Sequence, residues 1–156
     1  MAKIGRNKYH NASEQIFKKV GYECKIIGLC KLLVIKDRRR LFIDVAGKNL
    51  PYYGSDGREG FAWETFIDAT RLDKIDNLAS KYDAEPWIAF CYAILDNRFF
   101  KDFSFIVSIN GHNFGIKLIT TKEYRKNMKL RSAGSWDVVD LQRDLVTRLT
   151  CDPEIV

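Results

Sequence analysis

A continuous apolar run, Trp87 to Ala93 with the sequence WIAFCYA, limits most strongly what this chain can fold into. The run has the length of a β-strand, and a strand that is apolar at successive positions is buried on both of its faces. Other elements therefore have to cover it from both sides. A strand of this kind is typical of a mixed α/β domain, in which helices pack on both faces of one sheet.

The rest of the pattern supplies helices and further strands. Helical spacing of apolar residues predicts one helix from Tyr9 to Val20, ending near Gly21, and a second from Leu72 to Tyr82. Further strands are predicted over residues 22–29, 31–36, 39–46, 103–109 and 114–120. The last two flank Asn110-Gly111, which is a hairpin signal.

Three other segments complete the predicted order of elements. Residues 47–62 are polar and rich in glycine, which predicts a loop. Thr120 and Glu123 form the pattern of a capping box and predict a short basic helix through Lys129. A last helix is predicted after Ser135, from the spacing of Val138, Leu141, Leu145 and Leu149.

Residues 31–46 predict a hairpin that carries a lone acid. Side chains alternate along a strand, so one face of its second strand carries Leu41, Ile43 and Val45, and the other carries Phe42, Asp44 and Ala46. A two-residue turn at Asp37-Arg38 places Lys31 opposite Asp44, with Cβ atoms about 5 Å apart. We therefore expect these two side chains to form an ion pair.

Charge is concentrated at the beginning of the chain. Residues 1–40 contain 11 Lys and Arg against 3 Asp and Glu, whereas the remaining residues contain 15 against 17. A positive end on a nearly neutral body suits binding to the phosphate backbone of a nucleic acid. The alternative is a solvated basic face with no partner.

The segment from Gly21 to Phe90 resembles the archaeal Holliday junction resolvases of the PD-(D/E)xK nuclease superfamily. The matching features are Gly21-Tyr22 after a helix, the hairpin, Ile43-Asp44-Val45, the helix from Arg71 to Ala79, and Glu85-Pro86 before an apolar strand. The resemblance implies a restriction-endonuclease-like mixed sheet flanked by helices. The length of 156 residues predicts one domain over 1–156, and the resemblance makes it nuclease-like, with 1–93 as the resolvase-like core and 94–156 as additional strands and helices. The resemblance also implies DNA as a partner and a homodimer.

The catalytic pattern of that family carries over only at one position. The acid of its acid-x-Lys motif falls on Asp44, but the lysine falls on Ala46. The aspartate of its PD motif falls on Lys31, which reverses the charge. The family's helix glutamate falls near His10, for which a surface or capping role competes with a functional one. Its helix glutamine falls on Arg71.

Phosphodiester hydrolysis in this superfamily uses carboxylates around Mg²⁺, with a lysine that stabilises the developing charge. An active enzyme would be a Mg²⁺-dependent endodeoxyribonuclease with Asp44 as a metal ligand. Lys48 or Lys31 would then replace the missing lysine, since both can reach the same region. A second carboxylate would come from Glu14, or from Asp56 or Glu64 around the loop.

Three hypotheses follow for function. The first is a DNA-binding protein whose cleavage site is degenerate, the second is the active endonuclease, and the third is a structural or protein-binding module that touches no nucleic acid. Candidate backbone contacts are Arg38, Arg39, Arg40, Arg71 and Lys126, because arginine and lysine suit phosphate oxygens. Tyr52 and Tyr53 are candidates for stacking on an opened base.

The cysteine spacing and the hydropathy of the chain indicate the cellular compartment of the protein. The chain has no run of about 18 apolar residues that would span a membrane. Its four cysteines lack CxxC spacing and are interpreted as small hydrophobic residues rather than as disulfides or zinc ligands. We expect a cytoplasmic protein with no membrane partner.

Overall fold

The structure is a computed structural model that describes residues 4–52, 57–59, 62–133 and 136–140. Its centre is a six-stranded sheet with the strand order β1-β2-β3-β5-β7-β6. The strands are β1 (Glu23–Gly28), β2 (Lys31–Lys36), β3 (Arg39–Leu50), β5 (Glu85–Ile94), β6 (Val107–Ile109) and β7 (His112–Thr120). Only β3 and β5 pair in parallel; their neighbours in this sheet are antiparallel, so the sheet is mixed, as predicted.

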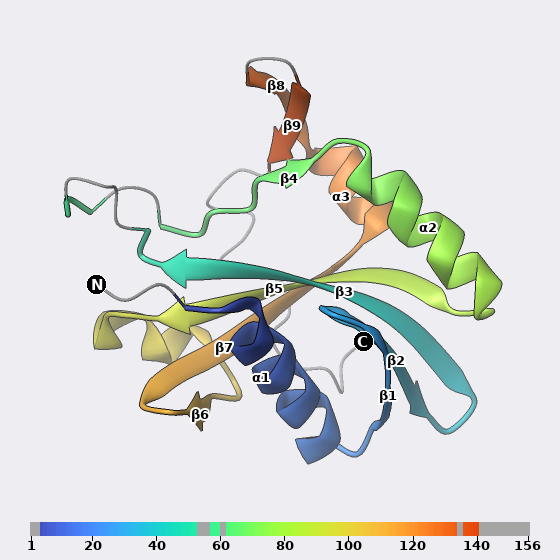
Figure 1. Cartoon of the computed structure of the whole chain (residues 1–156), viewed down its shortest axis with the longest axis horizontal. Coiled ribbons are helices and arrows are strands. Elements are labelled where there is room, and N and C mark those ends of the chain that lie inside the picture. Colours follow the sequence, from blue (N-terminus) through green and yellow to red (C-terminus); the bar gives the residue numbers. More distant parts are fainter. Residues whose placement is uncertain (1–3, 53–56, 60–61, 134–135, 141–156) are drawn as a thin grey trace.

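Helices cover both faces of the sheet, as Figure 1 shows. On one face α1 (Arg6–Lys19) buries its apolar stripe against the β3 side chains of Leu41, Ile43 and Val45. On the other face lie α2 (Arg71–Lys81) and α3 (Thr121–Asn127), over the cluster that contains Phe42 and Ala46. The predicted division of β3 into two faces is therefore confirmed.

The central strand is buried as its apolar run predicted. Ala89 and Cys91 of β5 face the α1 side, and Phe90 and Tyr92 face the α2 side, all with no solvent exposure. A short 3-10 helix, η1 (Asn97–Asp102), follows β5. Strands β7 and β6, from the second part of the chain, extend the same sheet beyond β5.

A second, three-stranded sheet stands above the first in Figure 1, next to the start of α2. It consists of β4 (Ile67–Asp68), β8 (Lys129–Ala133) and β9 (Trp136–Asp140), in the order β4-β9-β8. The predicted last helix is therefore wrong where it overlaps β9, because Val138 pairs with Asp68 and Arg131 in a sheet. The remainder of that predicted helix lies outside the described residues.

Turns and caps that were predicted from local sequence are confirmed. Asp37 adopts a left-handed backbone conformation (φ 55°) in the β2–β3 turn, and Asn110 and Gly111 do so in the β6–β7 turn (φ 49° and 81°). The Thr120 hydroxyl accepts a hydrogen bond from the Glu123 backbone N–H at 3.1 Å, as in a capping box. These turn and cap signals depend on contacts between residues a few positions apart, and tertiary packing did not override them.

Strand β3 continues further than the sequence pattern predicts. It extends to Leu50, whereas the glycine-rich loop was predicted to begin at Gly47. The register with β5 holds to the pair Leu50 and Ile94, so pairing on the β5 side keeps the segment extended. On the other side β2 pairs only as far as Asp44, which leaves the end of β3 with one free edge in the described part of the chain.

The remaining predictions concern cysteines and membranes. Cys91 is buried in the core, whereas Cys24 and Cys30 are partly buried and pack against it, and all three are free thiols. Cys151 lies outside the described residues. None of the helices in the described segments is long and apolar enough to cross a membrane.

Candidate active-site pocket

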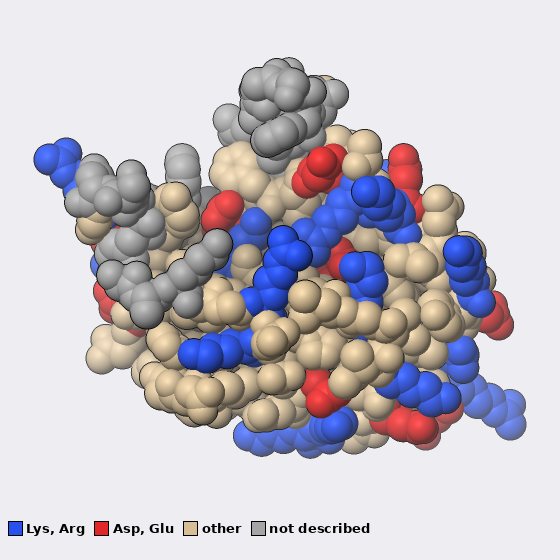
Figure 2. Space-filling view, viewed as in Figure 1, with Lys and Arg blue, Asp and Glu red and all other residues tan. Residues whose placement is uncertain are grey.

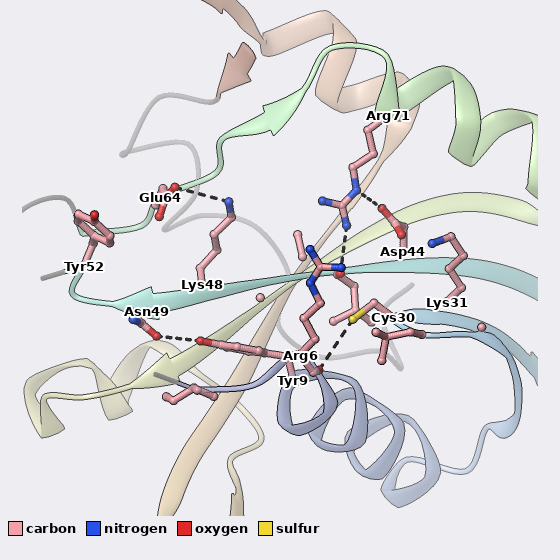
Figure 3. A pocket seen from close by; sticks show the side chains of 16 residues that line it. Arg6, Tyr9, Cys30, Lys31, Asp44, Lys48, Asn49, Tyr52, Glu64 and Arg71 are labelled. Carbon is pink, nitrogen blue, oxygen red and sulfur yellow. Dashed lines mark hydrogen bonds and ion pairs between the residues drawn. The ribbon is translucent and has the colours of Figure 1, made fainter. Parts of the chain in front are cut away.

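A pocket of about 710 Å³ opens beside the free edge of β3, beyond the pair that Lys31 of β2 forms with Asp44. The first turn of α1, the β1–β2 turn, the start of β2, β3, the segment around Glu64 and the first residue of α2 contribute to its wall. Figure 3 shows four cationic side chains projecting into it from these elements: Arg6, Lys31, Lys48 and Arg71. Two acids, Asp44 and Glu64, also line it.

Asp44 is bound by the guanidinium of Arg71. Its side chain is almost wholly buried, at 3% exposure, and its Oδ2 accepts a hydrogen bond from Arg71 Nε at 2.5 Å. The same guanidinium donates through Nη2 to the carbonyl oxygen of Val45 at 3.1 Å. Arg71 therefore both neutralises a buried carboxylate and satisfies a backbone carbonyl at the end of the β2–β3 pairing.

The predicted register of the hairpin is confirmed, but the predicted ion pair is wrong. Lys31 pairs with Asp44 across β2 and β3, and Lys36 pairs with Arg39, as the two-residue turn requires. The ion-pair partner of Asp44 among the described residues is nevertheless Arg71, not Lys31. The first residue of α2 lies over this face of β3, and its fork-shaped group bonds two acceptors where an ammonium offers only a point charge.

Lys48 lies on the same face of β3 as Asp44, because side chains alternate along a strand and β3 continues through Gly47. Its ammonium donates to the carbonyl oxygen of Phe66 at 2.6 Å and lies 3.5 Å from the carboxylate of Glu64. Burial lowers the pKa of Lys48, and Glu64 opposes part of that shift. The pocket thus contains two cation–carboxylate pairs side by side, at Asp44 and at Glu64 (Figure 3).

His10 is a buried structural group, whereas a surface or capping position was expected for a non-functional histidine here. It is 6% exposed, and its Nδ1 accepts a hydrogen bond from the backbone N–H of Cys30 at 3.0 Å. An accepting Nδ1 carries no proton. His10 therefore secures the turn between β1 and β2 behind the pocket wall.

Sequence reasoning missed Arg6, Tyr9 and Asn49 as pocket residues. Tyr9 Oη donates to Asn49 Oδ1 at 2.8 Å, and the Tyr9 ring lies against Gly47. Arg6 belongs to the basic segment at the start of the chain, but no spacing rule connects that segment to β3. The packing of α1 on the sheet brings Arg6 and Tyr9 to the pocket, and the continuation of β3 brings Asn49.

Gly47 is required by the close approach of Tyr9. A Cβ atom built there would lie 2.5 Å from the Tyr9 ring, well inside contact distance. We expect Gly47→Ala to displace that ring and to lower the free energy of unfolding by about 1–3 kcal/mol, as overpacking does. Urea denaturation followed by tryptophan fluorescence measures this.

The matched control for this substitution is Gly28→Ala, since a Cβ there meets only the Lys31 side chain at 4.0 Å. We expect that variant to unfold within about 0.5 kcal/mol of the parent, as surface changes do. Equal stability of the two glycine variants would contradict the contact between Gly47 and Tyr9.

The other predicted site residues lie away from this pocket. Arg39 pairs with Glu85 at 2.7 Å, and the Arg40 guanidinium donates to the Tyr82 carbonyl, so both side chains have partners within the fold. With Arg38 they line a separate, shallow hollow at the tip of the hairpin. Figure 2 shows Lys and Arg side chains across the middle of one face of the molecule. Lys126 is exposed on α3.

Glu14 is not brought to Asp44. It lies in α1, pairs with Lys18 one turn later at 3.3 Å and does not line the pocket. Glu64 does line it, so of the two described carboxylates considered as partners of Asp44, Glu64 is the one that the fold brings to the pocket. Asp56 lies outside the described residues.

The described donors do not fit a magnesium ion. Mg²⁺ requires near-octahedral coordination by oxygen, including one or two carboxylates. Here a guanidinium holds Asp44 and an ammonium lies beside Glu64. In the described part of the chain no three Asp, Glu, His or Cys side chains are grouped so that they could hold a metal ion. A cation entering the pocket would first have to displace bonded positive groups.

Comparison with known proteins identifies a similar fold. No protein-family model and no curated protein sequence matches this chain. Among solved structures, Hjc, a Holliday junction resolvase from Archaeoglobus fulgidus, matches with a TM-score of 0.55 at 10% sequence identity. The match covers 95% of this chain and 94% of the resolvase. This chain therefore has a restriction-endonuclease-like fold, a mixed sheet flanked by helices, similar to that of an archaeal Holliday junction resolvase.

Proposed function

We propose that this protein binds DNA through contacts to the phosphate backbone and that its ability to cleave DNA is weakened or lost. The observation that carries the proposal is the ion pair between Asp44 and Arg71 in the pocket. It places a fixed positive charge on the carboxylate that corresponds to the family's metal-binding acid. The pocket then attracts an anion, and its described residues offer no site for a cation.

The case for DNA as the partner rests on charge and fold together. The pocket has four cationic side chains against two acidic ones, and the first 40 residues carry a net charge of +8. Cationic clefts raise the local concentration of polyanions and contact phosphate oxygens without reading sequence. Hjc, the solved structure with a similar fold, is a Holliday junction resolvase, and this likeness favours DNA over other polyanions.

The case for weakened cleavage is chemical. Hydrolysis by this fold uses a divalent cation that polarises the phosphate and activates water. Arg71 stabilises phosphate charge but cannot lower the pKa of a water molecule as a metal does. Replacing the metal with a guanidinium therefore preserves binding while removing the step that generates the nucleophile.

The alternative is an active Mg²⁺-dependent endonuclease with a relocated lysine. One observation favours it: Lys48 projects into the pocket from the same face of β3 as Asp44, and Glu64 lies beside it. In that mechanism Arg71 would have to leave Asp44 when metal and DNA bind. A third possibility, a protein-binding module that reuses the fold, requires that the protein bind no nucleic acid.

An assay with Mg²⁺ or Mn²⁺ distinguishes these functions. We expect wild-type protein to retard linear and branched DNA in a gel at low salt but to leave plasmid and junction substrates uncut. Asp44→Ala is the matched variant, since it removes the family's metal ligand. Cleavage by wild type that Asp44→Ala abolishes would establish the endonuclease instead, and absence of DNA and RNA binding would leave only the protein-binding module.

Three further expectations stay predictions. They are the homodimer that the resemblance implies, a cytoplasmic location, and Mg²⁺ as a cofactor if the protein proves active. Sedimentation of the free protein tests the first. That residues 1–156 form a single domain also stays a prediction.

A further inference from the structure

We propose that the pocket receives the terminal phosphate of a DNA strand, a phosphomonoester, in preference to a phosphate within a continuous strand. This inference rests on the proposed function, since it names the part of the DNA that enters the same pocket. With this preference, the protein recognises strand ends or nicks in DNA.

The net charge of the pocket favours a phosphomonoester. Arg71 is paired with Asp44 and Lys48 with Glu64, whereas among the described residues neither Arg6 nor Lys31 has an acidic partner. The described residues that line the pocket therefore have a formal surplus of two positive charges. A phosphomonoester carries between about −1.5 and −2 at neutral pH, and an internal phosphodiester carries only one negative charge. The surplus matches the terminal group more closely.

The arrangement of the cationic side chains also favours a terminal phosphate. Figure 3 shows Arg6 reaching up from α1 towards Arg71, with Lys31 on one side and Lys48 on the other. A terminal phosphate presents three oxygen atoms to such a ring of donors, whereas an internal phosphate leaves only two of its oxygens free of the chain. A monoester can therefore satisfy more of these donors at once.

Helix ends and the β3 edge add donors to the same place. The first residues of α1 and α2 both line the pocket, and the N-cap residue of neither helix makes a side-chain cap, although Asp68 accepts from the N–H of Thr70. The N-terminal ends of two helices, which carry the positive ends of their dipoles, therefore border the pocket, and this favours a bound anion. Gly47 is exposed on the edge of β3 that lacks a neighbouring strand in the described residues.

The volume of the pocket suits a single nucleotide at the end of a strand. The pocket volume, about 710 Å³, falls within the range of sites that enclose a small ligand. That is room for a nucleotide-sized group. A strand end can enter such a pocket without distortion, whereas an internal nucleotide must first be extruded from the stack at a cost. Tyr52, 41% exposed on the pocket wall, offers a ring on which the terminal base can stack.

The test compares otherwise identical DNA strands that end in a 5′-phosphate, a 3′-phosphate or hydroxyl groups only. Fluorescence anisotropy with an internal label measures their affinities for the full chain. We expect one phosphorylated end to bind about tenfold more tightly than the hydroxyl end, the scale of one charged hydrogen bond. Comparison of the two phosphorylated strands shows which terminus the pocket accepts.

Two variants locate the effect. Arg6→Gln and Lys31→Gln should each bring the affinities for phosphorylated and hydroxyl ends close together. Lys101→Gln is the charge-matched control, because Lys101 is exposed in η1 and does not line the pocket. That variant should keep the preference. Circular dichroism verifies that all three proteins are folded.

Each outcome separates this inference from the proposed function. DNA binding with equal affinity for all three ends would overturn the inference alone. A preference that survives both Arg6→Gln and Lys31→Gln would place the phosphate elsewhere and overturn it as well. Failure to bind any DNA at low salt would overturn the proposed function and the inference together.

Discussion

Arg71→Met should destabilise the protein by about 2–4 kcal/mol, which is just below the 3–5 kcal/mol typical of breaking a fully buried ion pair. The physical reason is the charge left behind. Asp44 is 3% exposed, and without Arg71 its carboxylate loses the opposite charge that the described residues place at bonding distance. The carbonyl of Val45 also loses a donor. The free energy of unfolding in urea measures the effect.

A surface pair provides the control for this substitution. Arg39 makes a hydrogen-bonded ion pair with Glu85, but both side chains are more than 40% exposed. Arg39→Met should cost no more than about 1 kcal/mol, as for other exposed pairs. In addition, Asp44→Asn combined with Arg71→Met should recover part of the loss, because no buried charge remains unpaired. Equal costs for the Arg71 and Arg39 variants would show that Asp44 is adequately solvated without its partner.

Affinity for DNA should fall by roughly a hundredfold between about 50 and 200 mM salt if four phosphates are contacted, since each contact releases counterions. The logarithm of the affinity should then fall with the logarithm of salt concentration with a slope of about −3.6. Titrations of one linear duplex at several potassium chloride concentrations measure this slope. Flat binding over that range would contradict backbone recognition.

Removal of one contact should change the slope by a defined amount. Lys31→Gln should make it less steep by about 0.9, because one phosphate contact is lost. The control is Lys101→Gln, which removes the same charge away from the pocket. A Lys31 variant with an unchanged slope would remove this residue from the DNA interface, even if overall affinity fell.

Local patterns predicted much of the fold correctly. The unbroken apolar run of β5 specified a strand buried on both faces, and the two-residue turn at Asp37-Arg38 specified the pairing of Lys31 with Asp44. Both follow from the period of a strand and the geometry of a tight turn, which act over neighbouring residues. The prediction failed for β9, where apolar spacing suggested a helix and pairing with β4 and β8 produced a strand.

The candidate site was predicted only in part. Asp44, Lys31 and Lys48 line one pocket, as alternation along the hairpin and its extension suggested. The partner of Asp44 could not be found this way, because Lys31 and Arg71 are both cations that could reach it. The positions of Arg6 and Glu64 depend on how α1 and the segment before β4 pack against the sheet.

By itself, then, the sequence determined which side chains share a face of β3 and which residue of β2 stands opposite Asp44. Only the tertiary structure decided that Arg71 neutralises this acid, that Lys48 meets Glu64, and that β3 is left with a free edge beside them. The physical reason is range. Backbone geometry relates residues a few positions apart, whereas a buried carboxylate is paired by whichever cation the packing of distant elements brings within bonding distance.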